Sequence, residues 1–275
     1  MSIRTMLLLL VLVGLIVSAI IFYPQLENSL VFYPDKSLDD NPSSWNLSYK
    51  DVRFVTSDGE KLHGWFFPLS GKTPVLLFCH GNAGNISHRI ENVDLLVKRG
   101  ISVFLFGYRG YGLSSGRPSE NGIYTDGMAA YDYLTEMEKV SPDRIGVFGR
   151  SLGGAVAIEV ALQRKVRCII IENTFTSIRD MSKTIFPWLL FSPFLPDHYE
   201  NSSKIADVSV PKLIVHSRND EIVPFKMGEE LFAAAIGDKI FLPIDEAGHN
   251  DIYIIGGKAY LDAVTDFVSS HASSE

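Results

Sequence analysis

The chain has few cysteines and no cluster of basic residues. Its two cysteines among 275 residues, Cys79 and Cys168, both lie in apolar runs, so we interpret them as buried thiols. Two cysteines cannot build a disulfide framework, and a metal site would need other ligands, so we expect no metal and no cofactor. A net charge of −7 without a basic patch argues against nucleic acid as a partner.

Internal repeats, low-complexity tracts and nucleotide-binding loops are also absent from the sequence. The glycine-containing stretch at residues 81–84 has neither the Gly-Lys-Ser/Thr ending of a P-loop nor the G-x-G-x-x-G spacing. Apolar residues make up 46% of the chain, which is enough for a sizeable core. The length beyond the N-terminal segment suits one large α/β domain.

An almost unbroken apolar run covers residues 6–23, with Arg4 before it. As a helix it would be about 27 Å long, close to the thickness of about 30 Å of a bilayer's hydrocarbon core. The run continues past the small residues at 17–19, which favours a single-pass signal anchor over a signal peptide cleaved there. The positive-inside rule then places the domain that follows outside the cytoplasm. The alternative is a secreted or periplasmic protein after cleavage.

Residues 1–23 are therefore predicted to be the membrane segment, residues 24–48 a linker and residues 49–275 one domain. Residues 49–56 and 61–67 alternate around a Ser-Asp-Gly-Glu turn, which indicates a β-hairpin at a sheet edge. Beyond it, apolar runs alternate with helical stretches, which predicts a mostly parallel central sheet covered by helices on both faces. The predicted strands are 75–79, 101–106, 145–148, 166–171, 212–216 and 239–242, and the predicted helices are 86–99, 123–139, 151–163, 225–235 and 252–269.

The sequence Gly-Arg-Ser-Leu-Gly at residues 149–153 matches G-x-S-x-G between a predicted strand and a predicted helix. That context is typical of a sharp turn that exposes the hydroxyl of its central serine, here Ser151. The flanking glycines leave room for a strained backbone because they carry no Cβ. We expect Ser151 to be a nucleophile.

An acid and a base follow two later strands. Asp220 comes after the predicted strand 212–216, and His249 after the last strand. Reactive residues of parallel sheets gather beyond the carboxyl ends of the strands, and Ser, acid, His is a known chain order of the catalytic triad. We expect His249 to move the serine proton and Asp220 to orient the imidazole.

Two backbone N–H groups are expected to bind the oxyanion. One belongs to Leu152 at the helix start, and the other to Asn82 in the loop 80–84. His80 in that loop suits a structural hydrogen bond better than a base. The rival acids for the triad are Glu172, Glu221, Asp245, Glu246 and Asp251.

These motifs resemble the α/β-hydrolase superfamily, and more closely its membrane-anchored α/β-hydrolase-domain branch, which includes protein depalmitoylases. The resemblance implies an α/β-hydrolase fold with a short lid insertion, here residues 174–211. The apolar residues of that segment would suit an acyl chain or a bilayer, and the alternative is a helix packed into the domain's own core. The matching positions are the apolar segment 6–23, then 30–34, 80–84, 108–112, 149–153, Asp220 and 248–249.

The sequence thus predicts a serine hydrolase that cleaves an acyl ester or thioester through an acyl-enzyme intermediate. Its expected partners are a small-molecule or lipid-like acyl substrate or an acylated protein, and the membrane through the N-terminal segment. A peptidase or amidase on the same triad and a non-catalytic binding protein on this fold are the alternatives. Leaving-group specificity depends on pocket shape, which the sequence does not reveal.

Overall fold

The computed structural model describes residues 29–185 and 198–270 of the 275-residue chain. The chain divides into two compact units, Met1–Tyr33 and Pro34–Glu275. Of the first unit the structure describes residues 29–33, which lead into the short strand β1 (Tyr33–Pro34). The features described below belong to the second unit.

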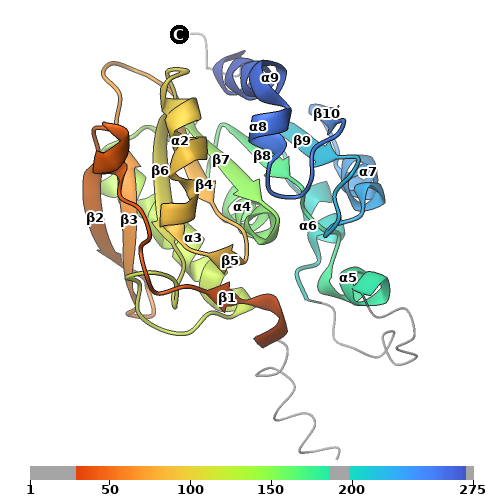
Figure 1. The fold of residues 1–275 in the computed structure, drawn as a ribbon, viewed down its shortest axis with the longest axis horizontal. Coiled ribbons are helices and arrows are strands. Elements are labelled where there is room, and N and C mark those ends of the chain that lie inside the picture. The colour runs from red at the N-terminus through yellow and green to blue at the C-terminus, as the bar shows by residue number, and fades with distance from the viewer. Residues whose placement is uncertain (1–28, 186–197, 271–275) are drawn as a thin grey trace, which may run out of the picture. The chain divides into compact units, whose positions relative to one another are not determined.

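Eight strands form the central sheet, in the order β10-β9-β8-β7-β4-β6-β3-β2 (Figure 1). Neighbours from β6 to β10 pair in parallel, whereas β2 pairs with β3 and β3 with β6 in antiparallel fashion. The predicted mostly parallel sheet with a hairpin at its edge is therefore confirmed. The strands are β2 (Lys50–Val55), β3 (Lys61–Phe67), β4 (Val75–Cys79), β6 (Ser102–Gly107), β7 (Ile145–Arg150), β8 (Cys168–Glu172), β9 (Lys212–Ser217) and β10 (Lys239–Ile244).

Helices cover both faces of this sheet. Helices α2 (Ile90–Val97) and α9 (Gly257–Ser270) share one core cluster with side chains from β4, β7 and β8. Helices α3 (Glu120–Glu136) and α4 (Leu152–Gln163) pack together behind the sheet, with α2 in front of it (Figure 1). Because both faces are covered, strands β4, β6, β7, β8 and β9 are buried along their whole length.

Three predicted helices differ from the observed ones. The predicted helix 123–139 is observed three residues earlier, as α3. The predicted helix 252–269 is split into α8 (Ile252–Ile255) and α9, because Gly257, the first residue of α9, takes a left-handed φ of +50° that interrupts the helical backbone at this junction. The predicted helix 86–99 begins as a 3₁₀ turn, η2 (Ile86–Arg89), whose first N–H groups are capped by Asn85.

The remaining elements are short. The structure has two further 3₁₀ turns, η1 (Pro42–Trp45) and η3 (Pro142–Arg144), and the short strand β5 (Ala83–Gly84). Helices α5 (Ile178–Ile185) and α6 (Asn201–Ala206) lie in the predicted lid segment, and α7 (Phe225–Ala234) follows β9. Residues 186–197 of that segment lie outside the described residues, so its role as a lid stays a prediction, as do the domain boundaries.

The predicted transmembrane helix and signal anchor need correction. Within residues 29–185 and 198–270, no helix has both the length and the apolar composition needed to span a bilayer. The expectation of a single-pass anchor is therefore not supported. Residues 6–23, on which that expectation rested, lie outside the described residues.

Arg109 ties three parts of the fold together at the end of β6. Its guanidinium donates to Asp58 in the hairpin turn at 2.7 and 3.0 Å, and to the fully buried Asp126 of α3 at 2.9 Å. The backbone N–H of Arg109 also donates to Asp126 at 2.7 Å. The Arg109 hydrogen bonds lower the pKa of Asp58 to about 2. The hairpin, the loop after β6 and helix α3 are thus joined through one side chain.

Replacing Asp126 should test this buried ion pair. We expect Asp126→Asn to lower the free energy of unfolding by about 3 kcal/mol, because it leaves buried positive charge poorly compensated. Asp132→Asn on the same helix is the matched control, since its partly exposed pair with Arg164 should contribute less than about 1 kcal/mol. Urea denaturation of both variants measures the difference. Equal losses would contradict a special role for Asp126.

Candidate active site

The predicted reactive residues all follow strands that end at the same edge of the sheet. Parallel pairing places the end of β4 beside that of β7, and the ends of β8 and β9 side by side. The loop 80–84 follows β4, Ser151 follows β7, and Asp220 and His249 follow β9 and β10. The structure therefore brings these segments to the carboxyl edge, where sites of such sheets lie.

Ser151 occupies a strained turn between β7 and α4. Its backbone has φ 53° and ψ −118°, a conformation that non-glycine residues rarely adopt and that typically costs about 1–3 kcal/mol. A Cβ on Gly149 would lie 2.3 Å from the Gly153 oxygen, and one on Gly153 would lie 2.0 Å from the Cys79 oxygen. Both glycines are therefore required by space, as the motif predicts.

Asp220 and His249 form a buried pair. His249 Nδ1 lies 2.8 and 3.0 Å from the two carboxylate oxygens of Asp220, whose side chain is fully buried. Asp220 also accepts hydrogen bonds from the backbone N–H groups of Ile222 at 2.9 Å and Val223 at 2.8 Å. These backbone donors fix the orientation of the carboxylate toward the imidazole. Because a carboxylate accepts, Nδ1 carries the proton and Nε2 is left with a lone pair.

Four of the five rival acids have other partners. Glu221 accepts from the backbone N–H of His249 at 3.0 Å, and Asp251 from that of Gly248 at 2.7 Å. Asp245 pairs with Arg218 at 3.0 Å. The side chain of Glu172 is engaged by Arg150 and by Tyr260. Of these carboxylates, only Asp220 meets the imidazole of His249 in the described part of the chain.

Ser151 and His249 lie in loops that both bond to residues at the end of β8, Ser151 to Glu172 and His249 to Asn173. Among the described residues, no hydrogen bond joins the Ser151 hydroxyl to His249. The backbone N–H of Ser151 donates to the backbone oxygen of Glu172 at 2.8 Å. Ser151 and His249 are both nearly buried, at 8% and 4% exposure. Such catalytic bonds are often loose without substrate and tighten in the Michaelis complex.

The loop 80–84 presents backbone groups beside Ser151. His80 Nδ1 donates to the Gly81 oxygen at 2.6 Å, and Tyr111 donates to the Asn82 oxygen at 2.6 Å. Because a peptide unit is planar and trans, fixing the Gly81 oxygen also fixes the direction of the Asn82 N–H. A Cβ on Gly81 would lie 3.6 Å from Ser151 Cβ, so this peptide is close to the serine. The structural hydrogen bond expected of His80 is confirmed.

A second buried charge pair lies directly behind the serine. Arg150 pairs with Glu172, and Tyr260 of α9 donates to the other Glu172 oxygen at 2.5 Å. The Arg150 guanidinium also lies over the ring of Tyr253, 5.0 Å from its centroid. Sequence analysis missed this network. The signal was available, because an arginine that ends a buried apolar strand requires a carboxylate partner.

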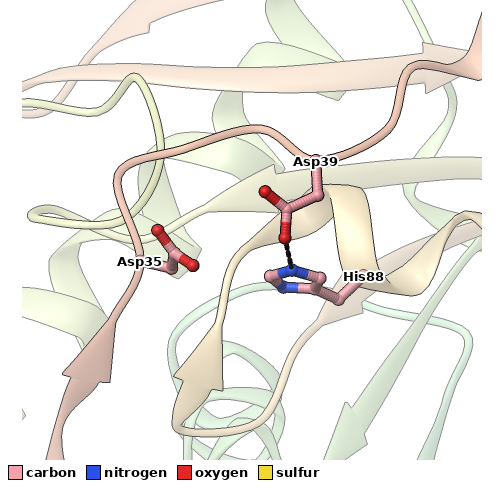
Figure 2. A group of neighbouring side chains, drawn as sticks. All are labelled: Asp35, Asp39 and His88. Atoms are coloured by element: carbon pink, nitrogen blue, oxygen red, sulfur yellow. Dashed lines mark hydrogen bonds and ion pairs between the residues drawn. The ribbon is translucent and has the colours of Figure 1, made fainter.

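Asp35, Asp39 and His88 form a cluster of metal-ligand types away from the predicted triad (Figure 2). Asp39 accepts from His88 Nε2 at 2.9 Å, whereas His88 Nδ1 accepts from the backbone N–H of Asn85 at 3.1 Å. The neutral ring therefore carries its proton on Nε2, the atom that faces the carboxylates, and offers no lone pair there. All three residues are exposed, and this arrangement does not fit a metal centre.

Comparison with known proteins identifies the family. A family model described as alpha/beta hydrolase fold matches residues 74–201. The alpha/beta hydrolase domain-containing protein WAV2 of Arabidopsis thaliana is 33% identical over 285 residues, covering 94% of this chain and 92% of that protein. An uncharacterized protein of Mycobacterium tuberculosis is 38% identical over 263 residues, covering 94% of each. The chain belongs to the α/β-hydrolase family.

Solved structures agree with this fold. The esterase Pf2001 of Pyrococcus furiosus superposes with a TM-score of 0.74, covering 88% of this chain and 99% of that one, at 20% identity. At that identity the likeness concerns the fold alone. The predicted α/β-hydrolase fold is thus confirmed, and family membership supports a hydrolase. The membrane-anchored branch is not confirmed by these relatives.

Two substitutions separate the predicted acid, Asp220, from the second buried carboxylate, Glu172. Asp220→Asn should lower kcat by about 10⁴-fold with little change in folding, because it disturbs the tautomer of His249. Glu172→Gln should instead lower the free energy of unfolding by about 3–5 kcal/mol, because it leaves Arg150 buried without a charged partner. Steady-state kinetics and urea denaturation measure the two effects. A folded but inactive Glu172→Gln beside an active Asp220→Asn would contradict the assignment.

His80 should make the fold sensitive to mild acid. Burial lowers the pKa of His80 from 6.5 to about 3, so the folded state keeps it neutral at pH 5 while the unfolded chain takes up a proton. The contribution of His80 to the free energy of unfolding is therefore complete above about pH 6.5. It falls as the pH drops, by about 2 kcal/mol between pH 7 and 5. In His80→Asn, whose amide can still donate to Gly81, this part of the loss should vanish from urea denaturation curves. An equal loss in both proteins would refute the idea.

Proposed function

We propose that this chain is a serine hydrolase that cleaves an acyl ester or thioester of a small-molecule or lipid-like substrate. The observation that carries the proposal is the buried Asp220–His249 pair, set at the same sheet edge as the strained Ser151 turn. Membership of the α/β-hydrolase family supports the hydrolytic class. We infer the ester or thioester substrate from the G-x-S-x-G motif around Ser151.

The hydrogen bonding of the Asp220–His249 pair suits general-base catalysis. With its Nδ1 proton donated to Asp220, His249 offers the Nε2 lone pair to the hydroxyl of Ser151. When Nε2 takes the hydroxyl proton of Ser151, the serine oxygen bonds to the substrate carbonyl carbon, and Asp220 stabilises the imidazolium that forms. The imidazolium then returns the proton to the departing alkoxide or thiolate. Water repeats the same steps to release the acyl group and restore Ser151.

Two backbone donors would stabilise the negative charge on the substrate oxygen. Leu152 is the first residue of α4, so its N–H has no acceptor within the helix, and the helix dipole points its positive end there. The Asn82 N–H is held in direction by the His80–Gly81 hydrogen bond. Such preorganised donors require no reorganisation at the moment of reaction, and each is typically worth about 3 kcal/mol.

Hydrolysis of a series of p-nitrophenyl esters and acyl thioesters of increasing chain length tests the proposal. We expect the full chain to turn over at least one member, and Ser151→Ala to lower kcat by about 10⁶-fold because the nucleophile is removed. The preferred chain length measures the size of the acyl pocket, and the ratio of ester to thioester rates defines the leaving group.

Ser203→Ala is the matched control, because Ser203 is exposed on α6 and bonds only to the Glu200 oxygen. It should keep the activity of the wild type. Faster cleavage of p-nitroanilides than of esters would favour the peptidase or amidase alternative. If the folded protein showed no turnover and no labelling by a serine-reactive phosphonate, these results would favour a non-catalytic binding protein.

A further inference from the structure

The three residues that end and follow β8 contact all the loops of the proposed triad. Glu172, Asn173 and Thr174 are each no more than 1% exposed. The backbone oxygen of Glu172 accepts from the Ser151 N–H at 2.8 Å, and the Thr174 hydroxyl donates to the backbone oxygen of Ser151 at 3.1 Å. Two of the three residues therefore hold the turn that carries Ser151, and the middle one bonds to the backbone of His249 and to Ser217, which precedes the Asp220 loop.

Asn173 bridges the other two loops with a single side-chain amide. Its Nδ2 donates to the backbone oxygen of His249 at 3.0 Å, and its Oδ1 accepts from the backbone N–H of Ser217 at 2.9 Å. Ser217 is the last residue of β9, three positions before Asp220. The same amide group thus fixes the main chain of the base and the start of the loop that carries the acid.

The backbone of Asn173 is held in an unusual conformation. Its φ of +47° lies in the left-handed region, which asparagine adopts more readily than other side-chain-bearing residues. Its N–H donates to the Val215 oxygen at 3.0 Å, which continues the pairing of β8 with β9 past the strand end. This conformation turns the side chain toward both loops while its own backbone stays attached to the sheet.

We propose that Asn173 is a positioning residue, which sets the distance between His249 and the turns of Asp220 and Ser151. This inference rests on the proposed function. Both of its bonds suit an amide, which offers a donor and an acceptor on one planar group, whereas an ionised carboxylate of the same shape offers acceptors alone. A carboxylate would turn a second acceptor toward the His249 oxygen. A shift of about 1 Å in a catalytic group can lower the rate about 10²-fold.

The substitution Asn173→Asp removes the donor without changing the shape of the side chain. We expect kcat to fall about 10²-fold with KM within about two-fold of the wild type, because substrate binding does not involve this residue. Asn173→Gly is the second variant, since glycine tolerates the positive φ and loses both bonds. It should show the same loss of kcat.

Asn201→Asp is the matched control. Asn201 is also fully buried, and its Nδ2 also donates to a backbone oxygen, that of Phe175 at 2.9 Å, but among residues 29–185 and 198–270 no hydrogen bond joins it to the loops of Ser151, Asp220 or His249. We expect its kcat to stay within about two-fold of the wild type at a temperature at which circular dichroism shows all variants folded. An equal fall of kcat in Asn173→Asp and Asn201→Asp, or none in either Asn173 variant, would overturn the proposal.

The proton NMR signal of the His249 Nδ1–H, hydrogen-bonded to Asp220, gives a readout that needs no substrate. It should shift or disappear in both Asn173 variants and stay unchanged in Asn201→Asp. An unchanged signal in the Asn173 variants would overturn the inference. Should the wild type cleave none of the acyl substrates, the proposed function fails, and this signal alone then decides whether Asn173 positions His249.

Discussion

The turn that carries Ser151 is enclosed so tightly that no side chain fits at positions 149 and 153. A Cβ on Gly149 would lie 2.3 Å from the Gly153 oxygen, and a Cβ on Gly153 would lie 2.0 Å from the Cys79 oxygen. The strained turn persists because neighbouring elements fix it, above all the hydrogen bond from its N–H to the end of β8. The placement of the hydroxyl therefore depends on the strand pairing of the sheet and on the helix that follows.

Two buried carboxylates at this edge of the sheet are each held by several donors. Asp220 accepts from an imidazole and two backbone N–H groups, and Glu172 from a guanidinium and a phenol. This pairing matters because an unpaired charge in such surroundings is very costly. It also separates the two carboxylates by role: one faces the proposed base, and the other holds the strand end from which the serine projects.

Local pattern was sufficient to predict the strands, the edge hairpin and the turn at Ser151. It failed where long-range contact or a single backbone conformation decides. The last helix is broken at Gly257 by a positive φ, and no periodicity reveals that break. Asn173 escaped notice because its partners lie 44 and 76 residues away along the chain and meet it only in the folded sheet. The predicted membrane helix rested on hydropathy alone and gained no support from the described residues.

The pair formed by Arg150 and Glu172 has a consequence for how this sequence can change over generations. The two positions lie 22 residues apart, yet each is buried against the other. Loss of either charge alone leaves the other buried without a charged partner, which destabilises the fold. A joint replacement by well-packed neutral residues avoids this destabilisation. The residue before the nucleophile and the residue that ends the next strand are thus expected to covary, so that a substitution at one accompanies a substitution at the other.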